Sequence, residues 1–304
     1  MTIGGTGDSR ASKDQRRDAA RLKAKALREQ QKKKDRRNRV FLQGGLVVAA
    51  VAIVAIVSLV IVNNIRPEGP GPKNMASDGV LIGQGMAVTE TVALEPDATP
   101  IPSEPDKTGA VADIRIYLDY LCPYCGDFES TNSAQIAKWV ESGAATVEIH
   151  PLSILTSKSA GTQYSLRAAN AAACVANYSP TDFYAFNSGM FENQPSEGST
   201  GLSDKEIKKV IKESGVSTSL SSIDTCVDEL TFKSWVQNAT SRALTGPIPN
   251  STLAAVSTTP TVLVNGKQYV GSLDDPKEFA SFVLQAAGET YSTSTPTPTP
   301  VPAG

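Results

Sequence analysis

The chain has 304 residues, enough for one large domain or two small ones, and 40% of them are hydrophobic, so most of it can form a packed core. Its only histidine, His150, excludes metal sites that need two histidines and is the one residue on which a Ser-His-Asp mechanism could rest. The net charge of −2 is unevenly distributed, because residues 1–39 carry 14 Lys and Arg against 5 Asp and Glu, and residues 40–304 carry 15 against 26.

A long apolar run follows the basic N-terminal arm. No charged residue lies between Arg39 and Arg66, and residues 40–62 form a 23-residue stretch with only four residues that are not apolar. A helix of that length spans about 35 Å, against about 30 Å for a bilayer core. The positive flank then predicts a single-pass cell-membrane protein, with residues 1–39 in the cytoplasm, a transmembrane anchor at 40–62 and the rest outside the cytoplasm.

Two alternatives exist for these N-terminal segments. A cleaved signal peptide is less favoured, because the basic and apolar regions are long for one and no small-x-small cleavage site follows at Asn63–Ile65. A nucleic-acid-binding arm is less favoured as well, since no aromatic residue before Phe41 is available to stack on bases. We therefore expect an orientation signal that also contacts anionic lipid, and no nucleic-acid partner.

Proline-rich segments divide the rest of the chain. Residues 63–77 are predicted as a linker, residues 78–95 contain two apolar runs typical of a short hairpin, and residues 96–110 are predicted as a loop. The tail at 291–304 alternates Thr and Pro, so it should be extended and without a core; a spacer role in the cell wall is open to it.

The predicted globular domain covers residues 78–290 and belongs to the α/β class. Its expected strands are Ile114–Asp119, Thr146–Ile149, Thr261–Val264 and Gln268–Val270, the last two joined by an Asn265-Gly266 turn. Its expected helices are the segment from Cys122 onward, Ser165–Val175, Asp182–Phe191, Asp204–Glu213, Ser221–Ala243 and Asp275–Ala287. A helical block at about 155–245 therefore separates two strand-containing halves.

Cys122 and Cys125 stand three residues apart where the first predicted strand passes into a helix. The helix dipole and free backbone N–H groups stabilise a thiolate at that point, which predicts Cys122 as a nucleophile of lowered pKa. Cys125, one turn into the helix, can then attack a mixed disulfide and release the partner. Pro123 suits the first turn, where no N–H is needed. A structural bridge or half of a zinc site is the alternative, but zinc would require a second close cysteine pair.

The other two cysteines, Cys174 and Cys226, lie 52 residues apart in helical runs. By elimination they form a structural disulfide, which would stabilise the fold by roughly 4 kcal/mol in the chain-entropy model. Two buried free thiols are the alternative. Pro260 stands directly before a strand, and from its position alone it is expected to be an ordinary trans loop residue.

Taken together, these features resemble the DsbA-like branch of the thioredoxin superfamily, in its membrane-anchored, actinobacterial type. The resemblance rests on the run YLDYLCPYC at 117–125, on TPTV at 259–262, on the helical insertion and on the Asn265-Gly266 turn. It covers about residues 78–290. It implies a thioredoxin fold with an inserted helical domain, preceded by one N-terminal transmembrane helix.

The resemblance also assigns roles to individual residues. Thr259–Pro260 becomes a cis peptide bond beside the active-site disulfide, whose loop pairs with substrate backbone and keeps metals from the thiols. Asp119 matches an acidic position common in this branch, which tunes Cys125 or relays protons; a solvated carboxylate at a strand end is the alternative.

Three departures from the pattern bear on the direction of electron flow. Pro123-Tyr124 is the dipeptide of glutaredoxins, whereas strong oxidants carry Pro-His, and that histidine stabilises the thiolate. Ile116 stands where the enteric oxidant has a buried acid. A threonine before the proline, as at Thr259, also occurs in isomerases and reductases.

The sequence thus predicts a membrane-anchored, extracytoplasmic thiol–disulfide oxidoreductase that introduces disulfides into secreted or envelope proteins through Cys122 and Cys125. No metal or organic cofactor is expected, and the resemblance implies a quinone-linked membrane partner for reoxidation. A reductase or isomerase on the same scaffold, or a non-catalytic binding module with this fold, are the alternatives. His150 is expected to be a surface or hydrogen-bonded residue at a strand end rather than a catalytic one.

Overall fold

The computed structural model describes residues 18, 21–25, 27–34 and 69–294. The chain divides into two compact units, Met1–Pro67 and Glu68–Gly304. The predicted anchor at 40–62, most of the basic arm and the last ten residues of the predicted tail lie outside the described residues.

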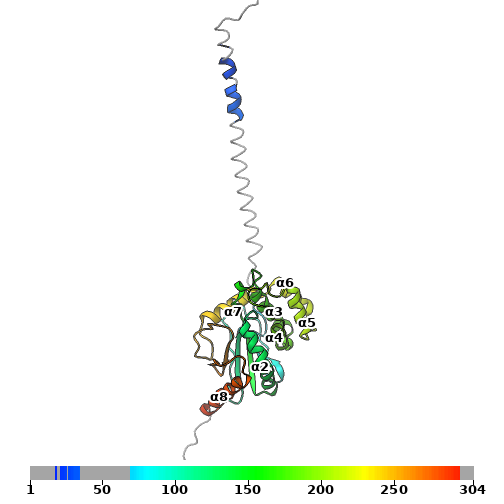
Figure 1. Ribbon diagram of the computed structural model, residues 1–304, viewed down its shortest axis with the longest axis vertical. Coiled ribbons are helices and arrows are strands. Elements are labelled where there is room, and N and C mark those ends of the chain that lie inside the picture. The colour runs from blue at the N-terminus through cyan, green and yellow to red at the C-terminus, as the bar shows by residue number, and fades with distance from the viewer. Residues whose placement is uncertain (1–17, 19–20, 26, 35–68, 295–304) are drawn as a thin grey trace, which may run out of the picture. The chain divides into compact units, whose positions relative to one another are not determined.

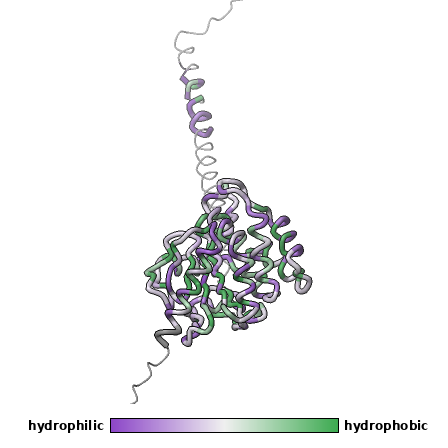
Figure 2. The backbone as a smooth tube through the Cα atoms, turned by 60° about the horizontal axis from the view of Figure 1, so that its bottom comes forward, coloured by the Kyte–Doolittle hydropathy of each residue, from purple (hydrophilic) through white to green (hydrophobic). Residues whose placement is uncertain are grey.

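The structure contradicts the predicted single-pass membrane localisation. Within the described ranges, no helix combines the length and apolar character that crossing a membrane requires. The described helical residues of the first unit, 21–25 and 27–34, are exposed and rich in Lys and Arg, and Figure 2 draws them mostly in the hydrophilic colour.

The second unit is built on a six-stranded mixed sheet in the order β2-β1-β4-β3-β5-β6. The central strand β3 (Ala112–Leu118) pairs in parallel with β4 (Ala145–Pro151) and antiparallel with β5 (Thr261–Val264). Every residue of β3 is buried, because both faces of the sheet are covered. The outer strands are β1 (Val80–Gly83), β2 (Ala87–Val88) and β6 (Lys267–Gln268).

Two helices pack on one face of this sheet. α2 (Pro123–Ser142) directly follows the loop after β3, and α8 (Pro276–Ser294) lies beside it, with Phe128 and Phe279 in edge-to-face contact at 5.2 Å. On the other face, Tyr117 and Leu263 of the sheet pack with residues of the 243–256 segment. The carboxyl end of β3 therefore lies in a sheet that is covered on both faces, and α2 begins just after it at Pro123.

A helical insertion joins β4 to β5, and Figure 1 shows α3 to α6 grouped to one side of α2. Its helices are α3 (Tyr164–Tyr178), α4 (Phe183–Glu192), α5 (Asp204–Glu213), α6 (Leu220–Glu229) and α7 (Lys233–Thr245). Short 3-10 turns, η1 (Gln84–Met86), η2 (Thr156–Lys158) and η3 (Pro180–Asp182), complete the set of described elements.

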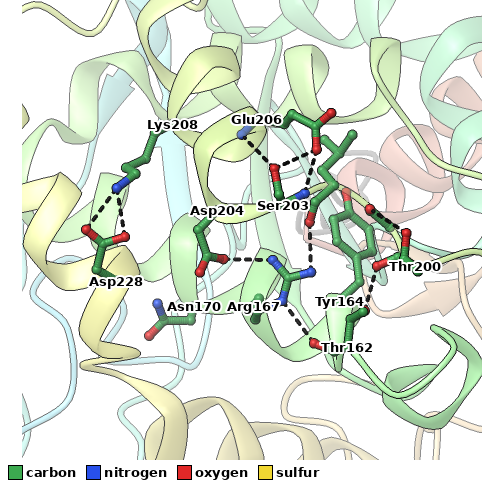
Figure 3. Close-up of polar contacts among 12 residues, drawn as sticks. Thr162, Tyr164, Arg167, Asn170, Thr200, Ser203, Asp204, Glu206, Lys208 and Asp228 are labelled. Atoms are coloured by element: carbon green, nitrogen blue, oxygen red, sulfur yellow. Dashed lines mark hydrogen bonds and ion pairs between the residues drawn. The ribbon is translucent and has the colours of Figure 1, made fainter.

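Arg167 of α3 fixes the start of α5 within the insertion (Figure 3). Its guanidinium bonds to the Asp204 carboxylate at 2.7 Å and to the carbonyl oxygens of Thr162 and Leu202. A capping box formed by Ser203 and Glu206 then satisfies the first N–H groups of α5. These hydrogen bonds and the ion pair hold α3 and α5 in fixed positions within the insertion.

Several boundaries differ from the sequence expectation. The single helix expected at Ser221–Ala243 is two helices, because Leu230 adopts a left-handed conformation and the Phe232 N–H bonds to the Asn170 side chain at 2.8 Å. Residues 69–77, expected as linker, pack on the domain, and Met75 is only 1% exposed. The C-terminal helix continues to Ser294, into the predicted tail.

Candidate active site

The two close cysteines lie at the junction of β3 and α2. Cys122 is the N-cap of α2 and Pro123 its first residue, so the thiol stands at the positive end of a 20-residue helix. The Cys122 carbonyl oxygen accepts from the N–H groups of Cys125 at 3.0 Å and Gly126 at 3.3 Å. Pro123 and Tyr124 are exposed, the latter by 63%, and Cys122 itself is 5% exposed. The pair therefore borders the surface.

Both thiols are free, and their environments separate their acidities. The pKa of Cys122 is lowered to about 6, chiefly by a hydrogen bond with the Cys125 thiol, with further contributions from Thr259 and the Cys125 N–H, while burial and the Asp119 charge oppose the shift. Burial raises the pKa of Cys125 well above its ordinary value. At neutral pH the structure therefore holds a thiolate at Cys122 and a protonated thiol at Cys125.

The loop before β5 approaches the same thiol from the other half of the domain. Tyr117 of β3 pairs with Thr261 of β5, so the residues just before Thr261 lie near the end of β3. The Thr259–Pro260 peptide bond is cis, and the Thr259 carbonyl oxygen lies 3.1 Å from the Cys122 sulfur, where it accepts a hydrogen bond from the protonated thiol. The structure thus brings Thr259 and Pro260 together with Cys122 across 137 residues.

Asp119 is fully buried beneath the junction. Its two carboxylate oxygens accept from the backbone N–H groups of Leu121 and Leu155, each at 2.9 Å. Burial raises its pKa, and these hydrogen bonds partly offset that rise. The carboxylate therefore joins the segment that enters α2 to the segment that leaves β4, and it is not the solvated strand-end group of the alternative interpretation.

The other sequence-selected residues lie elsewhere. His150 is buried within β4, stacked on Tyr117 with ring centroids 4.3 Å apart and with its Nε2 atom 3.4 Å from the Glu148 carboxylate. Cys174 and Cys226 form a disulfide that joins α3 to α6 inside the insertion. Among the residues that the structure describes, no group of three or more His, Cys, Asp or Glu side chains is arranged to hold a metal ion.

Two polar groups near the junction were not singled out from the sequence. The Gln194 side chain, which follows α4, donates to the carbonyl oxygens of Tyr120 at 3.2 Å and Cys122 at 2.9 Å. Glu129 of α2 is buried and accepts from Asn187 and Ser188 of α4; burial raises its pKa to about 7. In both cases the bonded residues lie more than 55 positions apart in the sequence, so local sequence patterns could not predict the contacts.

Comparisons with known proteins place these features in context. A family model described as thioredoxin matches residues 107–284, and no curated protein sequence matches the chain. Reduced DsbA from Mycobacterium tuberculosis is 27% identical, with 72% of this chain and 100% of that chain covered at a TM-score of 0.50.

Two further solved structures are similar. Reduced DsbG, a disulfide bond oxidoreductase from Mycobacterium tuberculosis, is 26% identical, with 73% of this chain and 96% of that chain covered at a TM-score of 0.51. Oxidised BdbD from Bacillus subtilis is 18% identical, with coverages of 73% and 100% at a TM-score of 0.50, and shares the fold.

Proposed function

This chain belongs to the thioredoxin family and is a thiol–disulfide oxidoreductase, and we propose that it donates disulfide bonds to substrate proteins. The observation that carries the proposal is the unequal acidity of its two active-site cysteines, with the Cys122 pKa lowered to about 6 and the Cys125 pKa raised. A stabilised thiolate favours the reduced enzyme, which makes the Cys122–Cys125 disulfide the more oxidising partner in an exchange.

The reaction proceeds in two exchanges. A substrate thiolate attacks the Cys122 sulfur of the oxidised enzyme, the Cys122–Cys125 bond breaks, and Cys125 leaves as a thiolate that takes up a proton in its buried site. A second substrate thiolate then attacks the substrate sulfur of the mixed disulfide and expels Cys122, whose lowered pKa makes it a good leaving group. Two electrons pass from the substrate dithiol to the enzyme.

The surrounding residues take supporting roles in this proposal. Pro123 and Tyr124 are exposed beside the nucleophile and offer the first contact to a substrate. The Thr259–Pro260 loop, whose carbonyl already faces Cys122, pairs with substrate backbone as the family resemblance implies. Asp119 fixes the junction through its two backbone hydrogen bonds, and as a buried carboxyl group three residues before the nucleophile it exchanges a proton with Cys125 in this proposal.

The setting of the reaction follows from the second cysteine pair. The Cys174–Cys226 disulfide supports work in an oxidising compartment, where thiol-bearing secreted or envelope proteins are the substrates. The electrons are then removed by a separate oxidised partner, for which the resemblance implies a quinone-linked membrane protein. The chemistry itself needs only sulfur atoms of the protein.

The reduction potential of the Cys122–Cys125 pair tests the direction of flow. The chain is equilibrated with mixtures of reduced and oxidised glutathione and quenched with acid. Free thiols are then alkylated with a maleimide reagent, which adds a fixed mass for each free thiol. A pair that stays reduced in buffers as oxidising as the endoplasmic reticulum identifies a disulfide donor. A pair that is oxidised already at the cytosolic glutathione poise identifies a reductase, and the proposed direction is then wrong.

A further inference from the structure

Gln194 connects the helical insertion directly to the nucleophile. It follows the C-cap of α4, where its backbone N–H bonds to the Phe191 carbonyl oxygen at 3.1 Å, and it precedes Pro195, which restricts its backbone to extended conformations. Its side-chain amide reaches back to the turn before α2 and donates to the carbonyl oxygens of Tyr120 at 3.2 Å and Cys122 at 2.9 Å. One side chain thus bonds to two carbonyl groups of the turn that carries Cys122.

A glycine makes room for this contact. Gly126 lies in the first turn of α2, and a Cβ atom there would come within 2.3 Å of the Gln194 Oε1 atom. Glycine inside a helix is less stable than alanine by about 1 kcal/mol, so its presence at this point needs a reason. The close approach of the Gln194 amide supplies one, and it is independent of the hydrogen bonds themselves.

The contact acts on the residue that carries the reactive sulfur. The Cys122 carbonyl oxygen has three donors, the N–H groups of Cys125 and Gly126 and the side-chain amide of Gln194, and the last is the shortest at 2.9 Å. Each donor offsets partial negative charge on an oxygen that belongs to the same residue as the thiolate. The same bonds fix the Cys122 backbone, and with it the direction of the sulfur toward Cys125 and the Thr259 carbonyl.

We propose that Gln194 is a positioning residue for thiol–disulfide exchange, which holds the Cys122 turn through the Gly126 opening and stabilises the thiolate from the helical insertion. This role rests on the proposed function, since it acts only through Cys122. It gives the insertion a direct part in the chemistry, because the segment after α4 bonds to the residue that carries the nucleophile, 72 positions earlier in the chain.

The test compares Gln194→Met with Asn193→Ala in the full chain. Methionine keeps the length of the side chain and removes both donors, whereas Asn193 is exposed and its side chain donates to the Gly189 carbonyl at the end of its own helix. The readout is the rate of alkylation of Cys122 against pH. We expect the Gln194→Met midpoint to rise by about half a unit to one unit and the glutathione equilibrium to move three- to tenfold toward the oxidised enzyme. Asn193→Ala should match the wild type in both.

A double-mutant cycle makes the test specific to this contact. Gly126→Ala should displace the Gln194 amide and raise the midpoint by a similar amount, and Gly126→Ala combined with Gln194→Met should add nothing further. An unchanged midpoint in Gln194→Met, or a shift equal to that of Asn193→Ala, overturns the proposal whatever happens to the melting temperature. Failure of the proposed function has a different signature, namely a wild-type Cys122–Cys125 pair that is already oxidised at the cytosolic glutathione poise.

Discussion

The chain contains two cysteine pairs, and the difference between them shows what makes a thiol pair reactive. Cys122 and Cys125 are free, three residues apart, at the N-terminus of a helix and beside exposed residues. Cys174 and Cys226 are bonded and buried in helix interiors of the insertion, 0% and 2% exposed. Both pairs consist of cysteine thiols, so their positions in the fold decide their different roles.

The surroundings of the second pair keep it inert. Asn170 links the two helices beside it, since its side chain donates to the Cys226 carbonyl oxygen at 3.3 Å and accepts from the Phe232 N–H at 2.8 Å. A thiolate in solution has no access to sulfurs packed among buried alanine residues. The first pair has the opposite features, with a helix dipole, a hydrogen bond between the two thiols that lowers the pKa of Cys122, and an exposed neighbour in Tyr124. Because Cys122 and Cys125 are themselves only 5% and 2% exposed, reactivity here follows from local charge and from the exposed residues beside the pair.

Removal of a single sulfur gives the largest effect expected from this comparison. Cys122→Ser should lower the rate of disulfide exchange by roughly a thousandfold or more, because the attacked atom is lost. Cys174→Ala combined with Cys226→Ala should leave the rate within a few-fold of wild type. The measurement is oxidation of a reduced model peptide by the purified chain. Comparable losses in both variants would show that the distinction between a reactive and an inert pair is wrong.

The stability of the two pairs should show the reverse order. Cys174→Ala combined with Cys226→Ala opens a long loop and should lower the free energy of unfolding by about 4 kcal/mol in the chain-entropy model. Reduction of the Cys122–Cys125 pair opens only a very short loop, so it should change the free energy of unfolding far less. Urea unfolding of both forms, followed by circular dichroism, provides the measurement. The expectation fails if loss of the long-range bridge leaves the unfolding midpoint in place.

The sequence was sufficient for the features that depend on short stretches of chain. The strand, the cysteine pair and the proline at the start of α2 all lie between Ile114 and Cys125, so the junction and its helix could be predicted from local patterns. The pairing of the distant cysteines followed by elimination, and the cis bond at Pro260 followed from the family resemblance, since nothing in its own surroundings distinguishes it from a trans proline.

The missed features depend on contacts between distant segments. β3 carries Asp113 and Arg115, which a pattern would place at the surface, yet both are buried and paired at 2.8 Å, with Glu148 of β4 nearby. Gln194 and Glu129 act through partners more than 55 residues away. No periodicity encodes such pairs, because each half looks like an ordinary polar residue until the fold brings the other half beside it.

Of the two cysteine pairs, only the reactive one can titrate, so it should make the stability difference between reduced and oxidised protein depend on pH near neutrality. The folded-state pKa of Cys122 is lowered to about 6, below the value of an unfolded cysteine, so its contribution to stability is complete above the unfolded pKa and is lost as pH falls through 6. Reduced protein should therefore gain stability relative to oxidised protein between about pH 6 and pH 9. Thermal melts of both redox forms across this range check the sign; a gap that is constant with pH contradicts it.

The smallest expected effect concerns the exposed residue between the two cysteines. Tyr124 is 63% exposed, so Tyr124→His should leave the fold intact and place a cation-forming group beside the Cys122 thiolate. The pKa of Cys122 should fall by a few tenths of a unit to one unit, and the disulfide should become correspondingly more oxidising. Tyr124→Phe serves as the control, because it keeps the ring and adds no charge. If the histidine and phenylalanine variants have the same glutathione equilibrium, then the dipeptide has little influence on the potential, and the buried contacts of Cys122 with Cys125 and Thr259 set it instead.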